Sequence, residues 1–378
     1  QLPSAWRIES GEQAWPLPEK DRQSLQEMLE ADHEALAMLQ ETPTIKGRVF
    51  DSSYADWIHS FSTRMAPLHR VVDLLTLNAI YAANEADATT VAQSLGAALD
   101  VAETLRQEPF TFSLGHRRGL IDRVLRTCAW ASKVVRFSPD QQQRLDQQLS
   151  SIQWPMALRD RLVTMRCAFR GVYHDPTPEI LMEFGFSKRI RHSKRVPIDS
   201  AWITAFKWSS LLRHSEALFL RQSEQIIGAS LKWKPGAWAS IRGKFASADR
   251  PRPVTLSARF LSYTESECAR PLRIRARLQV LRCALAARQY QQHTDRWVQT
   301  LDELVPDYLD DIPPDPFTGR PLQYQLRQGG RAIFSVGRDL QACEERYFRD
   351  ERNQQISDDI VIWLEAPEEN PDRERNEN

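Results

Sequence analysis

The sequence predicts an α+β fold, in which an irregular α-helical domain, bundle-like or solenoid-like, extends to about residue 265. A long helix then packs on a small antiparallel sheet of three or four strands. Apolar residues recur at helical spacing through most of the first 290 residues, whereas alternating strand patterns begin only after residue 320. With 378 residues, of which 42% are hydrophobic, the chain is long enough for more than one domain.

The pattern of the first 40 residues predicts an extended N-terminal segment followed by a helix. Residues 1–19 hold Trp6, Trp15 and three prolines with little periodicity, which favours an extended segment. From about Lys20 to Gln40 the apolar residues are spaced by three, four and seven, as on one face of a helix: Leu25, Met28, Leu29, Leu36 and Leu39.

The next segment, residues 66–172, predicts further helices. Residues 66–84 and 88–106 predict two antiparallel helices joined by the turn Glu85-Ala86-Asp87. Residues 114–135 predict another helix, and Ser138-Pro139-Asp140 is a strong cap for a helix over residues 140–152. A further helix is expected at 155–172. Because the periods vary, a regular repeat array is not predicted, and the helical domain is taken as residues 20–265.

The part of this domain at residues 187–252 is basic and rich in tryptophan. It holds fourteen Lys/Arg against four Asp/Glu, and a helix is expected within it over residues 199–227. Five cations fall within eight residues: Lys188, Arg189, Arg191, Lys194 and Arg195. Such a cluster would attract phosphate or anionic glycan, or anchor at a membrane surface. The alternative is a solvated loop with tryptophans in the core. A nucleic-acid partner is not expected, since the formal net charge is +0.

After Pro251 and Pro253 the pattern predicts a helix over residues 268–293 and then a change to turns and strands. Residues 311–319 are dense in turn-forming residues, and Gly329-Gly330 is typical of a hairpin turn. Strands are expected at 322–326, 331–336 and 360–364. The acidic, polar residues 365–378 predict a disordered tail.

The order of these signals resembles the C-terminal half of the major pseudopilin of type II secretion. That family has a DPWGNPYxY turn, a strand ending in SxGxDG and a closing DI strand. The matching residues here are Asp315-Pro316-Phe317, Gly319, Pro321, Tyr324, Ser335-Val336-Gly337 and Asp359-Ile360. The wider chain is similar to a family of uncharacterised bacterial envelope proteins, in which a helical domain carries this module at its end. The resemblance implies a pseudopilin-like module at residues 266–364.

The resemblance also implies a calcium site. In pseudopilins the loop between the last two strands commonly binds Ca²⁺, and carry-over of that loop points to Asp339 and Asp359, with Ser335 and Asp358 as further oxygen donors. This chain departs from the family, because the excursion after Asp339 is longer and lacks the glycines of the family loop. The alternative is that Asp358 and Asp359 cap a strand or face water.

Catalytic chemistry is poorly specified. A zincin motif fails after His33-Glu34, and Gly-x-Ser-x-Gly is absent. His174 and His214, in or near the basic segment, are the candidates for a general base, and a hydrolase site between the helical domain and the sheet is the alternative class. It requires a deep cleft that holds one of these histidines beside a carboxylate.

Cysteine usage leaves two alternatives open. The five cysteines include no C-x-x-C pair, so neither a zinc ribbon nor a thioredoxin-type site is predicted. They are either small buried residues, or one pair such as Cys128 and Cys167 forms a disulfide in an exported protein.

The function expected from these patterns is that of a non-enzymatic protein of the bacterial cell envelope, extracytoplasmic or periplasmic. Because the chain begins at Gln1, a removed or membrane-anchoring segment is expected ahead of it. The pseudopilin-like module would be a docking or structural unit for a protein partner in the envelope. A polyanion or anionic-lipid surface is the alternative partner, and no cofactor is expected apart from the calcium implied by the resemblance.

Overall fold

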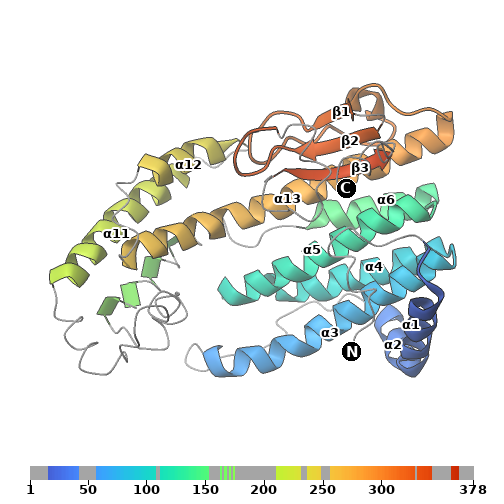
Figure 1. The fold of residues 1–378 in the computed structure, drawn as a ribbon, viewed down its shortest axis with the longest axis horizontal. Coiled ribbons are helices and arrows are strands. Elements are labelled where there is room, and N and C mark those ends of the chain that lie inside the picture. The colour runs from blue at the N-terminus through green and yellow to red at the C-terminus, as the bar shows by residue number, and fades with distance from the viewer. Residues whose placement is uncertain are drawn as a thin grey trace, which may run out of the picture. The chain divides into compact units, whose positions relative to one another are not determined.

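A computed structural model (Figure 1) describes the fold of most of the chain. The residues that it describes are 16–41, 57–107, 111–152, 210–230, 236–247, 256–327, 330–342 and 359–365, with the pairs 162–163, 166–167, 170–171 and 173–174. The chain divides into two compact units, unit 1 (residues 1–155 and 273–378) and unit 2 (residues 156–272). The described part is mainly helical with one three-stranded antiparallel sheet, so the predicted α+β class is confirmed.

The first part of unit 1 is a set of packed helices whose apolar faces meet in one core. Leu75, Leu95, Leu120 and Ile121 are fully buried in this core. The helices are α3 (Trp57–Asn84), α4 (Ala88–Glu103), the 3-10 helix η2 (Thr104–Gln107), α5 (Thr111–Val134) and α6 (Pro139–Ser151).

Two predicted helix starts are confirmed by their caps. At α4, the Asp87 carboxylate accepts hydrogen bonds from the backbone N–H of Thr89 and Thr90, and Ala86 before it has a φ of 57° in the tight turn. At α6, Ser138 and Gln141 form a capping box with Pro139 in the first turn. Local chemistry therefore sets both boundaries where the sequence placed them.

The first predicted helix is two helices. α1 (Glu19–Ala31) ends at Asp32, whose φ of −104° and ψ of 15° leave the helical region, and α2 (His33–Glu41) follows. The break lets Leu25 and Leu29 of α1 and Leu36 of α2 all enter the core of unit 1. A single straight helix was predicted because the apolar spacing continues across the break.

α13 (Leu256–Thr294) is the longest helix described, at 39 residues. It starts before the predicted residue 268 and crosses the predicted domain boundary at 265. The division between the two units falls within it, between residues 272 and 273. Its residues Val280, Leu281, Cys283 and Ala284 are fully buried in unit 1.

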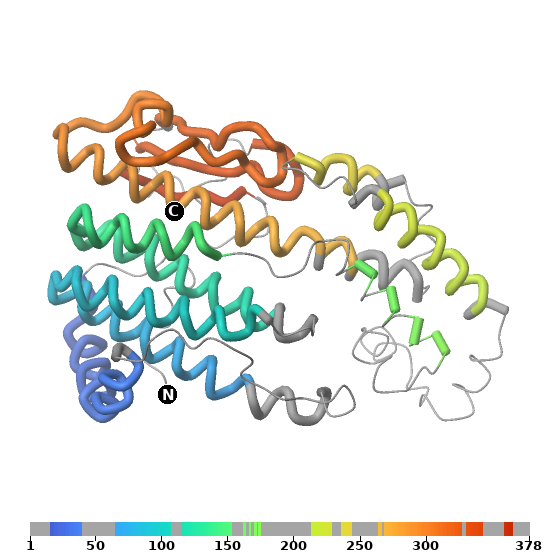
Figure 2. Tube along the Cα trace, turned by 180° about the vertical axis from the view of Figure 1, so that it is seen from behind, coloured from blue at the N-terminus to red at the C-terminus, as the bar shows by residue number. Residues whose placement is uncertain are grey.

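The sheet consists of β1 (Gln323–Arg327), β2 (Gly330–Ser335) and β3 (Ile360–Glu365), in the order β1-β2-β3. All three predicted strands are therefore confirmed. Ile333 of β2 pairs with Tyr324 of β1 and Ile362 of β3, and Ile333 and Ile362 belong to the same core as α13. Figures 1 and 2 both show the sheet lying along the C-terminal part of α13.

A β-bulge interrupts the pairing of β2 with β3. Arg331 pairs with Glu365 but Ala332 pairs with Trp363, so Leu364 is an extra residue on β3. Arg288 of α13 donates from Nη2 to the carbonyl oxygens of Trp363 at 3.3 Å and Leu364 at 3.2 Å. The guanidinium thus pairs with carbonyl groups at the irregular point of the strand, and burial lowers the pKa of Arg288 to about 10.

In unit 2, α11 (Ser210–Ser230) packs on α12 (Ala237–Ser247). Phe219 and Trp238 are fully buried. The predicted helix over residues 199–227 is confirmed from Ser210 onward, and residues 199–209 lie outside the described part. The four described two-residue segments between residues 162 and 174 are all helical, which agrees with the helix expected at 155–172.

Three of the four cysteines in the described part follow the buried alternative. Cys128, Cys268 and Cys283 are buried, Cys167 is exposed, and none of the four is in a disulfide, so the suggested bond between Cys128 and Cys167 is wrong. Cys128 is 2% exposed because its side chain packs in the apolar core of unit 1.

None of the helices in the described part of the chain combines the length and the hydropathy that a membrane span requires.

Candidate functional site

The Asp315 turn, residues 314–321, precedes β1 and is linked to the residue after β2 by the buried carboxylate of Asp315. Asp315 is 2% exposed and accepts hydrogen bonds from the N–H of Phe317 at 2.8 Å and of Val336 at 3.2 Å. Gly319 has a φ of 73°, which a residue without Cβ adopts at little cost, and its N–H donates to the Asp315 carbonyl at 2.7 Å. The hydrogen bonds of Asp315 therefore fasten this turn to the end of β2.

The residues of the implied calcium site have other roles where they are described. The Ser335 hydroxyl is buried and accepts from the N–H of Gly337 at 3.3 Å. The Asp339 carboxylate accepts from the N–H of Gln341 at 3.1 Å, and Asp359 lies half-buried just before β3. Asp358 lies outside the described residues. No group of three or more His, Cys, Asp or Glu side chains in the described part is placed to hold a metal ion.

A polar cluster ties the three strands to the loop after α13. The Glu365 carboxylate accepts hydrogen bonds from the Trp297 indole N–H and, at 3.2 Å, from Arg331 Nε. Tyr324 accepts from Arg331 Nη1 at 3.2 Å and donates from its hydroxyl to the carbonyl of Val298 at 2.7 Å. These mutual contacts hold β1, β2 and β3 in register at one end of the sheet.

β1 is an edge strand of the described sheet, since only β2 pairs with it there. Leu326 of this strand is 65% exposed, which is unusual for a leucine in a sheet that packs on a core. It lies on the same face as Tyr324, two residues away, because side chains alternate along a strand. The β1 edge, residues 323–327, therefore combines a backbone edge with an exposed apolar side chain.

The catalytic candidates of unit 2 lie at its surface. The Nε2 atom of His174 is 3.6 Å from a Glu216 carboxylate oxygen, and the His174 side chain is 65% exposed. His214, on α11, is exposed as well. The neighbouring Ser215 is buried, with its hydroxyl 3.3 Å from the Tyr173 hydroxyl. The structure thus brings one histidine to a carboxylate, on an exposed surface.

The five cations proposed to bind polyanions, Lys188, Arg189, Arg191, Lys194 and Arg195, lie outside the described residues. Among the tryptophans of the same basic segment, Trp238 is described, and it is fully buried in unit 2. It belongs to the core, as the alternative interpretation of the segment expects. Trp202, Trp208 and Trp233 lie outside the described part.

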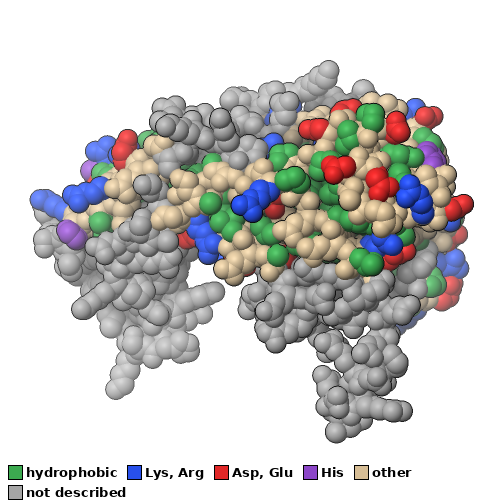
Figure 3. All heavy atoms as spheres, turned by 90° about the horizontal axis from the view of Figure 1, so that it is seen from above, with side chains coloured by type: hydrophobic (Ala, Val, Ile, Leu, Met, Phe, Trp, Pro, Cys, Tyr) green, Lys and Arg blue, Asp and Glu red, His purple; other side chains and the backbone are tan. Residues whose placement is uncertain are grey.

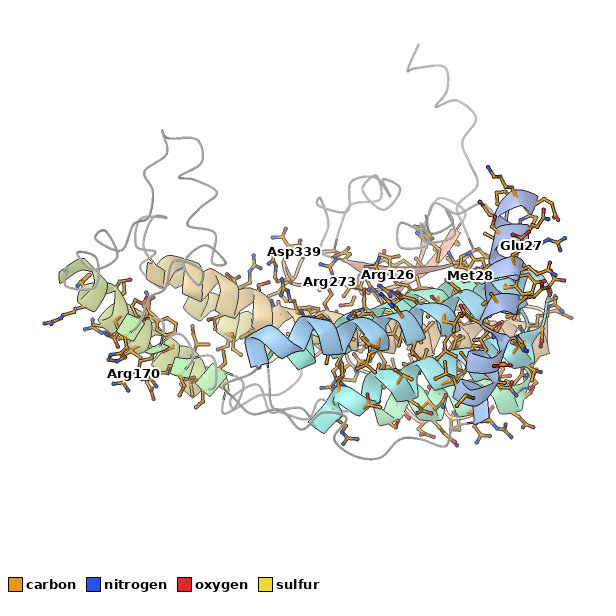
Figure 4. The ribbon with its side chains drawn as sticks, turned by 90° about the horizontal axis from the view of Figure 1, so that it is seen from below. Glu27, Met28, Arg126, Arg170, Arg273 and Asp339 are labelled. Carbon is orange, nitrogen blue, oxygen red and sulfur yellow. The ribbon has the colours of Figure 1, made fainter. Side chains whose placement is uncertain are left out.

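Figure 4 labels Arg126 of α5 and Arg273 of α13, two arginines on the helices of unit 1. Two of the ion pairs made by such arginines join α13 to the helices packed beside it. Arg277 pairs with Asp122 of α5, and Arg282 donates from Nε to Asp146 of α6 at 2.5 Å. Asp122 also accepts from Arg126 Nε at 3.0 Å. These contacts fix α13 between the helices and the sheet.

No family model, curated protein or solved structure matches this chain. The similarity to pseudopilins and to envelope proteins therefore stays a prediction from the residues. A function for the chain is supported by the geometry of its described residues alone.

A histidine pair was missed by the sequence analysis. His69 of α3 and His116 of α5 lie with Nε2 and Nδ1 2.7 Å apart and their rings edge to face. Burial lowers the pKa of both side chains, and positive charge nearby lowers it further, from His116 and Arg123 for His69 and from Arg118 for His116. The two residues are 47 positions apart, so no spacing rule connects them.

This pair predicts a loss of stability in mild acid. Because the folded pKa values lie below the ordinary value of 6.5, the unfolded chain takes up protons first as the pH falls. The contribution of the pair is fully present above about pH 6.5. It declines as the pH falls from there to the folded pKa values.

Thermal melting between pH 8 and pH 5 measures this loss. The double variant His69→Gln/His116→Gln should show a smaller fall in Tm than the wild type over this range, whereas His33→Gln, at an exposed histidine, should match the wild type. Equal pH dependence in all three proteins would contradict the proposed role of the pair.

Proposed function

We propose that this chain is a non-enzymatic protein of the bacterial cell envelope whose C-terminal module, residues 266–364, docks a protein partner. The β1 edge is the docking element, and the observation that carries the proposal is the exposed Leu326 on this edge strand. Extended segments bind such edges by main-chain hydrogen bonds, while side-chain contacts give specificity.

Polar contacts hold the three strands in place, so that an added strand could pair with β1. Arg288 fixes the bulge of β3, Asp315 fixes the end of β2, and Arg331 joins β1 to β3 through Tyr324 and Glu365. A rigid edge lowers the entropy cost of ordering the site when a partner binds. An added strand next to β1 would also cover Leu326, whose full burial contributes about 1.5–3 kcal/mol.

The hydrolase alternative depends on His174 and His214. Because His174 is 65% exposed and His214 is exposed, neither lies in the deep cleft that this alternative requires. The contact with Glu216 has the geometry of a surface ion pair, as does the 3.8 Å contact of Arg170 with the same carboxylate. We therefore favour interaction over catalysis.

Site-specific photo-crosslinking in the native cells tests the docking proposal. A photoreactive residue at position 326 should give one defined protein adduct in the envelope fraction. The same residue at Met38, which is 71% exposed on unit 1, should not give that adduct. In a second measurement, Leu326→Lys should weaken co-purification of the identified partner at least ~10-fold, because the apolar contact is lost.

Two results would overturn the proposal. One is an adduct pattern at position 326 that is the same as at position 38. The other is an unchanged yield of the partner with Leu326→Lys, since this would place the contact elsewhere on the chain.

A further inference from the structure

One face of α11 is exposed between residues 213 and 228. The exposed residues recur at spacings of three and four, as expected for one stripe of a helix. They are Arg213, Ala217, Arg221, Gln225 and Gly228, and the neighbouring His214 and Glu224 are exposed as well. Arg213 and Arg221 are eight residues apart, which corresponds to about 12 Å along the axis.

The carboxylates of α11 are already engaged by cations from the segment at residues 162–174. Glu224 pairs with Arg166. Glu216 is approached by Arg170 at 3.8 Å and by His174 at 3.6 Å. Because the two acids are compensated in this way, the electrostatic field over the exposed face is set by Arg213 and Arg221.

The charge of the chain is divided between its units. Unit 2 contains 20 Lys/Arg and 10 Asp/Glu, and unit 1 contains the other 30 and 40, although the formal net charge of the whole chain is +0. Figure 3 shows Lys, Arg and His side chains on the described surface of unit 2, with Asp or Glu beside them. A planar anionic surface would therefore attract unit 2 rather than unit 1.

The large aromatic side chains described in unit 2 are not available for stacking. Tyr173, Phe219 and Trp238 are all buried. Single-stranded nucleic acid is held by stacking of its bases on exposed aromatic rings, and this α11 face offers none among its described residues. A charged planar surface requires only the cations.

We propose that the α11 face, through Arg213 and Arg221, binds the surface of an anionic phospholipid membrane. This inference rests on the proposed envelope function, and it gives unit 2 a role separate from the β1 edge of unit 1. The attraction is electrostatic, so it weakens as salt shortens the screening length from about 10 Å at 0.1 M to about 3 Å at 1 M.

Vesicle co-sedimentation with the full chain tests the proposal. The wild type should bind vesicles that contain an anionic phospholipid at low salt, and it should release them at high salt or when the lipid is neutral. Arg213→Ser/Arg221→Ser should bind ~30-fold more weakly, which corresponds to ~1 kcal/mol for each cation lost near the surface.

The matched control is Arg144→Ser/Arg320→Ser, which removes the same charge from exposed positions of unit 1. It should bind like the wild type, and an equal loss in both double variants would overturn the proposal. So would vesicle binding that survives Arg213→Ser/Arg221→Ser but is lost when Arg189, Arg191, Lys194 and Arg195 become Ser.

A third arm uses a single-stranded oligonucleotide and a sulfated glycan in place of vesicles. Salt-sensitive binding to either polymer through Arg213 and Arg221, with no vesicle binding, would replace the membrane by that polymer. Failure of vesicle binding leaves crosslinking at position 326 unaffected, so the two proposals fail separately.

Discussion

Changing Asp122 to Ala is expected to lower the free energy of unfolding by about 3–5 kcal/mol, the largest effect predicted for a single side chain. The carboxylate of Asp122 pairs with Arg277 of α13 and accepts from Arg126. Arg277 is only 17% exposed, and burial lowers its pKa to about 10. It is still charged at neutral pH, so the variant leaves a buried cation without this counter-charge.

Urea unfolding followed by circular dichroism measures the loss. Asp122→Asn, which keeps hydrogen-bond acceptance without the charge, should fall between wild type and Asp122→Ala. Glu27→Ala, at an exposed acid of α1 beyond its first turn, should change the unfolding free energy by less than ~0.5 kcal/mol. A loss below ~1 kcal/mol for Asp122→Ala would contradict the view that this contact holds α13 in unit 1.

Asp315→Ala is expected to cost about 2–4 kcal/mol. It removes the acceptor from two buried N–H groups, those of Phe317 and Val336, and each unsatisfied group costs about 1–3 kcal/mol. The side chain also closes the turn before β1, so the change should loosen β1 and the end of β2 together.

Two further variants separate the loss of these hydrogen bonds from a general effect of charge. Asp315→Asn keeps one amide oxygen and should lose less stability than Asp315→Ala. Asp311→Ala removes an exposed acid of the same loop and should be nearly silent. If Asp315→Ala and Asp311→Ala lose the same amount, the buried hydrogen bonds do not carry the effect.

Features with a local cause were predictable from the sequence. The turn at residues 85–87 and the cap at Ser138 depend on residues within a few positions, and the starts of the two helices that follow them were predicted correctly. The strands were recognised because β2 and β3 alternate or run apolar between clear turn residues. The special role of the Asp315 turn was indicated by Asp-Pro and Gly, although its bond to Val336 was not.

Features that depend on distant contacts were not predictable. Asp122 and Arg277 are 155 residues apart, and many other acids and arginines offered equivalent pairings. One signal was present for Arg288. It lies three residues beyond Leu285, the last of four apolar residues at helical spacing (Ile274, Leu278, Leu281 and Leu285), but its partners in β3 could not be inferred. His69 and His116 were likewise ordinary helical residues until α3 and α5 were packed.

The ends of two helices were also not predictable from the local sequence. Apolar spacing continues across Asp32, so the break between α1 and α2 was hidden, and only the shared core explains it. Conversely, α13 continues through Pro271 and begins at Leu256, whereas the prolines at 251 and 253 and the weak pattern after them suggested a later start.

The claim on which the docking proposal depends is that α13 and the three strands form one cooperative unit. Hydrogen exchange followed by mass spectrometry tests it directly. The amides of residues 276–287, 331–335 and 360–364 should be protected to a similar degree, and Asp122→Ala should lower their protection together. Rapid exchange throughout the strands, with α13 still protected, would show that the strands and α13 do not unfold as one cooperative unit.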